Sequence, residues 1–120
     1  MKTILVIDDD PTIIDVLRLF AAQIGYSCDA ANSGEVALEK IANNTYWAVI
    51  CDLQMPGLNG VELYDRIRER NPGLSDKFVL LTGSLLDLKT EHKVEECNIK
   101  VLMKPFHFKS IVTLFSAFQD

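Results

Sequence analysis

Five short apolar runs, each followed by a segment with helical periodicity, are the feature that most constrains how this chain can fold. The runs occupy residues 3–7, 26–31, 47–51, 77–82 and 99–103. Continuous β-branched and apolar stretches such as Thr-Ile-Leu-Val-Ile at 3–7 are typical of strands buried on both faces of a parallel sheet. Strands that alternate with helices predict a parallel sheet covered on both faces, because right-handed crossovers place the helices there.

The segments between the runs carry start and stop signals for helices. Asp10 before Pro11 predicts an N-cap with proline at the first helical position, and Gly25 predicts the end of that helix. Asn59 with Glu62 three residues later resembles a capping box. The remaining helices are predicted from Asn32-Ser33-Gly34 to Asn43-Asn44, from Ser84 or Asp87 to about Cys97, and from His107 to Phe118, with Asn71-Pro72 as the stop of the third helix.

Five strand–helix repeats within 120 residues predict one α/β domain that spans residues 1–120. The expected architecture is a single doubly wound five-stranded parallel sheet flanked by five helices. Strand order 2-1-3-4-5 is favoured, since neither half of a dinucleotide-binding fold is complete. In that order the topological switch point lies between the first and third strands, and Asp8, Asp9 and Asp52 are expected at its mouth.

Composition and charge exclude several classes of function. The formal net charge is -5, and no run of Lys or Arg is long enough to follow a phosphate backbone, so this chain is not expected to bind nucleic acid or an anionic membrane directly. No apolar run approaches the roughly 20 residues of a membrane-spanning helix, and no signal peptide is predicted, which predicts a cytoplasmic protein. Three isolated cysteines (Cys28, Cys51 and Cys97) predict buried, reduced thiols. His92 and His107 are expected to be solvated.

Polar side chains follow four of the predicted strands. They are Asp8 and Asp9 after the first, Asp52 after the third, Thr82 after the fourth and Lys104 after the fifth. Three converging carboxylates repel one another unless a cation neutralises them, and Mg²⁺ binds carboxylates together with phosphate oxygens. Lys104 is placed to hold Asp52 and a phosphoryl oxygen, and Thr82 offers a hydroxyl donor. This layout predicts a phosphoryl-transfer site in which Asp52 is the nucleophile, without the P-loop of a nucleotide-binding site.

Four motifs resemble, in order and spacing, the receiver domain of two-component response regulators, and the resemblance covers essentially the whole chain. They are Ile-Leu-Val-Ile-Asp-Asp-Asp-Pro, Val-Ile-Cys-Asp-Leu-Gln-Met-Pro-Gly-Leu-Asn-Gly, Leu-Leu-Thr-Gly-Ser and Val-Leu-Met-Lys-Pro-Phe. The resemblance implies the flavodoxin-like fold of the chemotaxis-regulator type. It also implies that Asp52 accepts a phosphoryl group from a phosphohistidine on a histidine kinase or histidine phosphotransfer protein.

The resemblance further implies a ligand set and a pair of phosphoryl contacts. Asp8, Asp9 and Asp52 would bind Mg²⁺ together with the backbone carbonyl of Gln54. Thr82 and Lys104 would contact the phosphoryl oxygens. Asp10 looks like a helix cap rather than a ligand. The assignment of the Mg²⁺ ligands within Asp8 to Asp10 nevertheless keeps an ambiguity of one residue.

Three positions bear on how fast the switch resets and how it is read. In the family, the residues two beyond the phosphoacceptor and two beyond the threonine influence hydrolysis of the phosphoryl group. Here they are Gln54 and Ser84, whose neutral polar side chains predict neither strong protection nor fast hydrolysis. Val101 departs from the family, which usually has an aromatic residue three positions before the lysine. Valine is stiff at χ1 and has no ring to rotate. The family's usual readout, through the face formed by the fourth and fifth strands and their helices, is therefore in doubt, while the phosphoryl chemistry is not.

The predicted function is therefore a switch that phosphorylates and dephosphorylates itself, and not a turnover enzyme. Its downstream protein partner is not identified, and a homodimer that forms on phosphorylation stays open. One alternative is a degenerate receiver that binds proteins independently of phosphorylation, which Val101 keeps open. The other is a small Mg²⁺-dependent phosphatase, which is disfavoured because such enzymes need a second acid where Gln54 stands. A free-standing receiver, a phosphorelay shuttle and a fragment of a larger protein are equally compatible with these residues.

Overall fold

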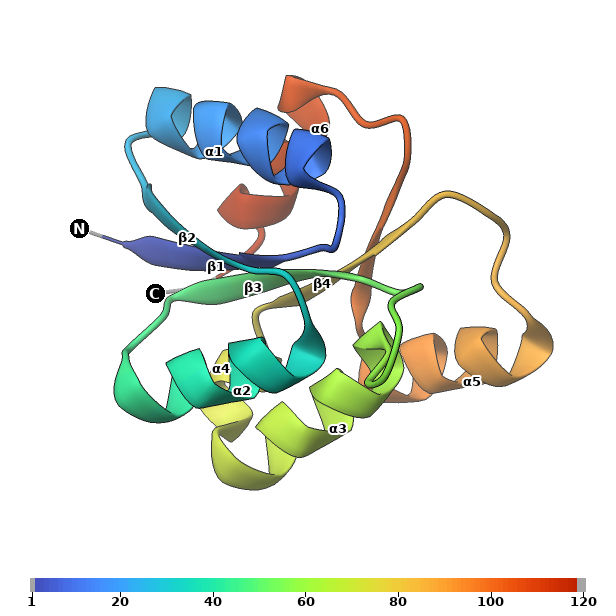
Figure 1. The fold of residues 1–120 in the computed structure, drawn as a ribbon. Coiled ribbons are helices and arrows are strands. Elements are labelled where there is room, and N and C mark those ends of the chain that lie inside the picture. Colours follow the sequence, from blue (N-terminus) through green and yellow to red (C-terminus); the bar gives the residue numbers. More distant parts are fainter. Residues whose placement is uncertain (1, 119–120) are drawn as a thin grey trace.

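The five strands form one parallel sheet in the order β2-β1-β3-β4-β5 (Figure 1). The structure is a computed structural model and describes residues 2–118. The strands are β1 (Thr3–Ile7), β2 (Ser27–Ala31), β3 (Ala48–Asp52), β4 (Phe78–Thr82) and β5 (Lys100–Met103). This confirms the predicted sheet and strand order. All five residues of β3 and of β4 are buried, as expected for central strands that are covered on both faces.

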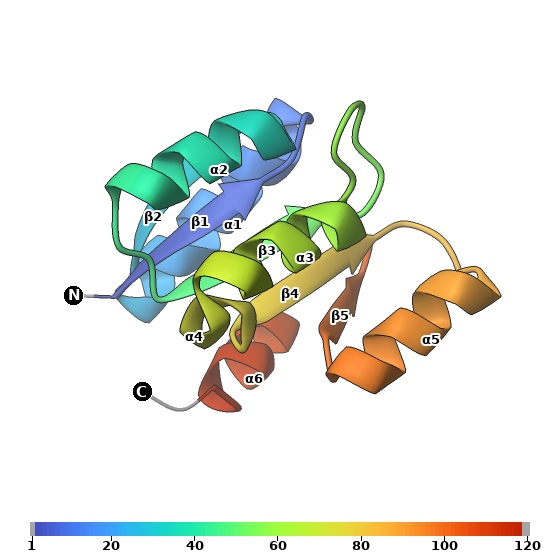
Figure 2. The same cartoon turned by 90° about the horizontal axis from the view of Figure 1, so that it is seen from below.

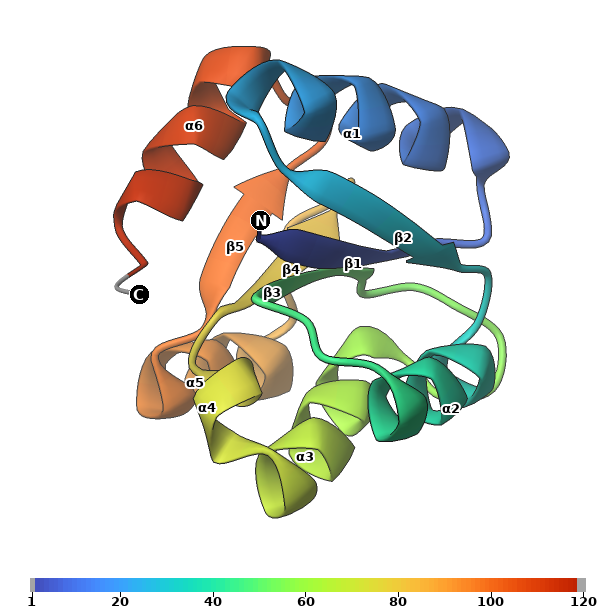
Figure 3. The same cartoon turned by 90° about the vertical axis from the view of Figure 1, so that its left-hand side faces the viewer.

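Helices cover both faces of the sheet (Figure 3). They are α1 (Pro11–Ile24), α2 (Gly34–Asn43), α3 (Gly60–Arg70), α4 (Pro72–Ser75), α5 (Leu88–Cys97) and α6 (Phe108–Ser116). Helices α1 and α6 pack on one face, and α2 to α5 pack on the other. Each layer encloses its own apolar cluster, because successive side chains of a strand point to opposite faces of the sheet. Within residues 2–118, no helix is long and apolar enough to cross a membrane.

The predicted capping signals are confirmed at several helix starts. The Asp10 side chain accepts the backbone N–H two residues further on, at 2.9 Å. Asn59 and Glu62 form both hydrogen bonds of a capping box at α3. Of the two candidates for the cap of α5, Asp87 is the one that caps it, accepting the Thr90 N–H at 2.7 Å. Asp10 therefore fixes the geometry of the turn that follows β1.

One helix was not predicted, and several boundaries differ by one residue. Asn71-Pro72 ends α3 as expected, but the same pair also begins the short α4. The Asn71 side chain accepts the Leu74 N–H at 3.2 Å, and Pro72 is its first helical residue. The described residues thus contain six helices instead of five. Strands β2, β3, β4 and β5 each begin one residue later than the apolar runs predict.

The cysteines and histidines largely follow their predicted roles. Cys28, Cys51 and Cys97 are all free thiols. Cys51 is buried, so the prediction of buried thiols is correct for Cys51 and wrong for the other two, which are half-buried. His92 and His107 are exposed, as expected.

An aromatic cluster lies at the amino ends of the strands, away from the predicted site. The Trp47 ring centroid lies 5.2 Å from that of Tyr26 and 5.7 Å from that of Phe115. The ammonium groups of Lys2 and Lys77 lie 4.4 Å and 5.3 Å from the Trp47 ring, within the range of cation–π attraction. This end of the sheet is therefore held by ring packing.

Candidate functional site

Three carboxylates converge at the carboxyl ends of β1 and β3. Asp8 follows β1 directly and Asp52 is the last residue of β3, and these two strands are neighbours in the sheet. Oxygen atoms of Asp8, Asp9 and Asp52 all lie within 4.8 Å of one another. Asp8 is 0% exposed and Asp52 is 6% exposed, whereas Asp9 is open to solvent. Asp10 caps α1, and its carboxylate is not one of the three in this cluster.

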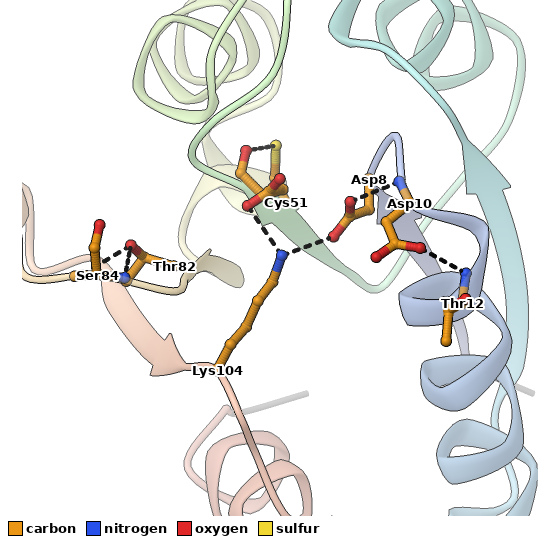
Figure 4. A network of polar contacts seen from close by, with 8 residues as sticks. Asp8, Asp10, Thr12, Cys51, Thr82, Ser84 and Lys104 are labelled. Carbon is orange, nitrogen blue, oxygen red and sulfur yellow. Dashed lines mark hydrogen bonds and ion pairs between the residues drawn. The ribbon is translucent and has the colours of Figure 1, made fainter.

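Lys104 reaches this cluster from the end of β5. Its Nζ atom lies 3.4 Å from Oδ2 of Asp8 and 3.5 Å from Oδ1 of Asp52 (Figure 4). The backbone N–H of Lys104 donates to the carbonyl of Thr82 at 2.7 Å, which ties the end of β5 to the end of β4. The peptide bond from Lys104 to Pro105 is cis. The sequence-predicted pairing of Lys104 with Asp52 is therefore present, and Asp8 shares the same ammonium group.

Burial raises the pKa of both Asp8 and Asp52 above the usual value of an aspartate. The charge of Asp52 raises the pKa of Asp8 further. Two contacts act in the opposite direction at Asp8: the backbone N–H of Asp10 donates to Oδ1 at 2.9 Å, and Lys104 attracts the carboxylate. Burial remains the largest cause of the pKa shift at both residues, so the single ammonium group of Lys104 does not fully compensate the two buried carboxylates. An added cation would relieve this electrostatic cost.

Thr82 lies at the same end of the sheet, but its hydroxyl group is turned toward its own loop. Thr82 is completely buried at the end of β4. Its Oγ1 donates to the Ser84 carbonyl at 3.0 Å and accepts the Ser84 N–H at 3.3 Å. Figure 4 shows this pair on the far side of the Lys104 side chain from Asp8. The structure thus brings the three carboxylates and Lys104 together, and it holds the Thr82 hydroxyl in a separate hydrogen-bond pair.

The remaining predicted positions are Gln54, Ser84 and Val101. Gln54 is exposed, and its backbone N–H lowers the pKa of Asp52, against the effect of burial. Ser84 is exposed in the loop after β4. Val101 is half-buried on β5, where it pairs with Leu80 of β4 and packs against the apolar cluster on the α2–α5 face. Val101 is therefore separate from the carboxylates and belongs to the edge strand of the sheet.

Gly60 is a residue of the site that sequence reasoning missed. A Cβ atom on Gly60 would lie 2.6 Å from Cδ1 of Leu80 and 2.9 Å from the backbone oxygen of Asp52. The Gly60 N–H also donates to the carbonyl of Leu53 at 3.1 Å. The start of α3 therefore packs directly against the strand end that carries Asp52. The sequence signal that could have identified this close approach is a glycine at the first position of the helix, immediately after the Asn59 cap.

This α/β sheet with an acidic cluster and a lysine at its carboxyl edge defines a class of signalling domain. Residues 4–116 match the family model of the response regulator receiver domain, and the chain belongs to this family. It is a family of two-component signalling switches rather than of enzymes, and the cluster of Asp8, Asp9 and Asp52 is typical of the receiver Mg²⁺ site.

Among curated relatives, the chain is 32% identical to the regulatory protein VanRB of Enterococcus faecalis over 110 residues, which are 91% of this chain and 48% of VanRB. It is 30% identical to the receiver protein CpdR of Brucella abortus, over 93% of this chain and 92% of CpdR. The chain thus spans about half the length of VanRB and nearly all of CpdR. The solved structure of the response regulator TrrA from Thermotoga maritima, in complex with Mg²⁺ and BeF, superimposes with a TM-score of 0.85. It is 32% identical over 98% of each chain.

Proposed function

We propose that Asp52 accepts a phosphoryl group from the phosphohistidine of a histidine kinase or histidine phosphotransfer protein, and that residues 1–120 act as one cytoplasmic receiver domain. The observation that carries this proposal is the position of Asp52. Its carboxylate lies 3.5 Å from the Lys104 ammonium group and within 4.8 Å of carboxylate oxygens from Asp8 and Asp9. A carboxylate held beside a cation and two further acids suits phosphoryl transfer, where positioning and charge neutralisation provide most of the catalysis.

In the proposed transfer, a carboxylate oxygen of Asp52 attacks phosphorus. The new P–O bond forms as the P–N bond to the donor imidazole breaks, and the imidazole nitrogen leaves with the bonding electrons and takes up a proton. Lys104 would turn from Asp8 to a phosphoryl oxygen, since its Nζ atom already lies between the two acids. The phosphoryl group adds about -1.5 to -2 charges at a site where burial already disfavours negative charge. Lys104 therefore stabilises the product more than it stabilises the free site.

The residues present fit Mg²⁺, which is a hard cation that prefers oxygen ligands. Asp8, Asp9 and Asp52 would hold it with the backbone carbonyl of Gln54. The raised pKa values of Asp8 and Asp52 support this fit, because they indicate negative charge that Lys104 alone does not neutralise. When bound, Mg²⁺ supplies positive charge to phosphoryl oxygens. The complex of TrrA with Mg²⁺ and BeF supports the same assignment in a relative that is 32% identical.

Thr82 would connect phosphorylation to a change of shape. To donate to a phosphoryl oxygen, its hydroxyl must give up the bond of 3.0 Å to the Ser84 carbonyl. The loop that contains Ser84 would then lose one anchor, and a downstream protein or a second copy of the chain would bind differently to the changed surface.

Exposed Gln54 and Ser84 would set how readily water reaches the phosphoryl group. Moving the switch from 1:99 to 99:1 requires about 5.5 kcal/mol of differential stabilisation. With Val101 in place of an aromatic residue, this loop is the proposed route.

Intact-mass measurement after incubation with phosphoramidate and Mg²⁺ tests the assignment. The chain is expected to gain one phosphoryl adduct, Asp52→Ala to gain none, and chelation of Mg²⁺ by EDTA to prevent labelling of the wild type. Asp15→Ala is the matched control, because Asp15 is an exposed acid on α1. An equal adduct on Asp52→Ala would overturn the proposal. Labelling that persists in EDTA would overturn the role of Mg²⁺ alone.

A further inference from the structure

The loop between β3 and α3 contains one of the proposed ligands of Mg²⁺, the backbone carbonyl of Gln54. The Gln54 N–H acts on the Asp52 carboxylate and lowers its pKa, so this residue lies at the edge of the acidic cluster. Backbone hydrogen bonds fix both ends of the loop: the Leu53 N–H donates to the Leu81 carbonyl at 2.8 Å, and the Gly60 N–H donates to the Leu53 carbonyl at 3.1 Å. The contacts between these ends decide where the Gln54 carbonyl lies.

Leu58 packs against the first residue of α2, and this contact holds the second half of the loop. A Cβ atom on Gly34 would lie 2.7 Å from Cβ of Leu58 and 3.3 Å from its backbone oxygen, so any larger residue at position 34 would force the loop to move. The neighbouring Glu35 makes a second contact, since a Cβ atom on Gly57 would lie 2.9 Å from its Oε2. Figure 2 shows the loop, in green between β3 and α3, beside the start of α2.

The start of α2 is itself fixed relative to Asp8. The Asp8 N–H donates to the carbonyl of Ala31, the last residue of β2, at 3.1 Å. Ser33 then caps α2 by accepting the Val36 N–H at 3.1 Å. Because Leu58 packs on this fixed helix start, the loop is held in register with Asp8. The contact thus connects proposed ligands that come from different strands.

We propose that Leu58 is a positioning residue that makes the cation site selective for Mg²⁺ over Ca²⁺. The inference rests on the proposed function and concerns which metal the same site takes. Mg²⁺ demands a nearly ideal octahedron of ligands at about 2.0 to 2.1 Å, whereas Ca²⁺ accepts roughly six to eight oxygen ligands at about 2.3 to 2.6 Å in flexible geometry. A loop held by Leu58 fixes the Gln54 carbonyl and therefore suits the ion with the stricter requirement. A loop released from α2 would still suit Ca²⁺.

The same contact has a simpler interpretation, in which Leu58 stabilises the fold like any half-buried leucine. The two interpretations differ in what removal of the side chain does to the two ions. A loss of stability alone would change the affinities for Mg²⁺ and Ca²⁺ by the same factor, because both ions bind the folded chain. A displaced loop would weaken Mg²⁺ more than Ca²⁺, because only Mg²⁺ depends on narrowly defined ligand positions.

NMR titrations of the full chain with MgCl₂ and with CaCl₂ test the proposal. Leu58→Ala is expected to raise the Kd for Mg²⁺ by about tenfold and the Kd for Ca²⁺ by less than about threefold. Gly34→Ala should act in the same direction from the other side of the contact, because its added Cβ displaces Leu58. Leu58→Met should restore the wild-type ratio of the two Kd values, since an unbranched side chain of similar volume fills the same space. Leu38→Ala on α2 is the matched control, because it removes the same atoms from a half-buried leucine outside the loop.

Three results would overturn the inference. They are an unchanged Kd for Mg²⁺ in Leu58→Ala, an equal increase of both Kd values, and the same loss of selectivity in Leu38→Ala. Chemical-shift dispersion in the same spectra checks that each variant is folded, and Gly34→Ala provides the same comparison should Leu58→Ala fail to fold.

Labelling of wild-type Asp52 by phosphoramidate separates this inference from the proposed function. Labelling that requires Mg²⁺, together with any of the three results, refutes the role of Leu58 alone. Selective loss of Mg²⁺ affinity in Leu58→Ala without labelling of the wild type refutes only the role of Asp52 as phosphoacceptor. A wild type that neither binds Mg²⁺ nor is labelled refutes both.

Discussion

The side chains at the two ends of the sheet affect stability in opposite ways. At the carboxyl end, Asp8 and Asp52 are buried carboxylates of the same sign that share Lys104, and burial raises the pKa of both acids. At the amino end, Trp47 packs against Tyr26 and other rings, in an arrangement that favours folding. The acidic site therefore costs stability, and apolar packing elsewhere offsets the cost. If the two ends act independently, a substitution at the amino end should leave the chemistry at the carboxyl end unchanged.

Trp47→Ala should have the largest effect, a loss of about 3 kcal/mol in the free energy of unfolding. The substitution removes the ring that Tyr26 and Phe115 pack against. Urea unfolding measures the loss, and Leu88→Ala, at a position 78% exposed, should change stability by no more than about 0.5 kcal/mol. At a temperature where the variant is folded, the rate of Asp52 labelling should equal that of the wild type. Slower labelling of folded Trp47→Ala would show that the two ends are coupled.

Gly60→Ala should affect stability and chemistry together. The added Cβ atom would lie 2.6 Å from Leu80 Cδ1 and 2.9 Å from the Asp52 backbone oxygen, so α3 or the end of β3 must move. Overpacking of this kind costs about 1 to 3 kcal/mol. Labelling of Asp52 should slow in the folded variant. Gly73→Ala is the control, since its Cβ would have its nearest neighbour at 3.8 Å. Unchanged labelling of Gly60→Ala would mean that the site tolerates displacement of β3.

Asp52→Asn should increase the free energy of unfolding at neutral pH by about 1 to 2 kcal/mol, as is common when a functional residue is relaxed. Burial raises the pKa of Asp52 in the fold, so ionisation favours the unfolded chain. That penalty is complete above the folded pKa and absent below the unfolded pKa. The gain should therefore shrink as the pH falls through this window. Urea unfolding at several pH values measures it, with the exposed Asp15→Asn as control. A gain that does not change with pH would show that charge is not its cause.

Features set by a clear local pattern or by sheet topology could be predicted from the sequence, and features set by an ambiguous signal or by the packing of particular atoms could not. The apolar runs, the Asn59 capping box and the convergence of acids at strand ends follow from local pattern and sheet topology. Pro72 was ambiguous, because proline both ends one helix and suits the first turn of another. The orientation of the Thr82 hydroxyl depends on where the loop places the Ser84 carbonyl. The close approach of Gly60 to Asp52 depends on how α3 seats on the sheet.

Tyr46→Phe should have a smaller effect than the substitutions of Trp47, Gly60 and Asp52, and its dependence on pH should be opposite to that of Asp52→Asn. The Tyr46 hydroxyl donates to Oδ2 of Asp29 at 2.6 Å, and this bond is the largest cause of the lowered pKa of Asp29. Asp29 thus contributes stability above its unfolded pKa, and the contribution is lost as the pH falls through its folded pKa. The loss in Tyr46→Phe should be about 1 kcal/mol at neutral pH and fade in acid. Lys40→Met should cost less, because the ion pair between Lys40 and Asp29 is open to solvent. A loss in Tyr46→Phe that persists in acid would assign it to packing. A loss that fades would show that the contribution of Asp29 disappears at a lower pH than the range in which protonation relieves Asp52, because the pKa of Asp29 is lowered and that of Asp52 is raised.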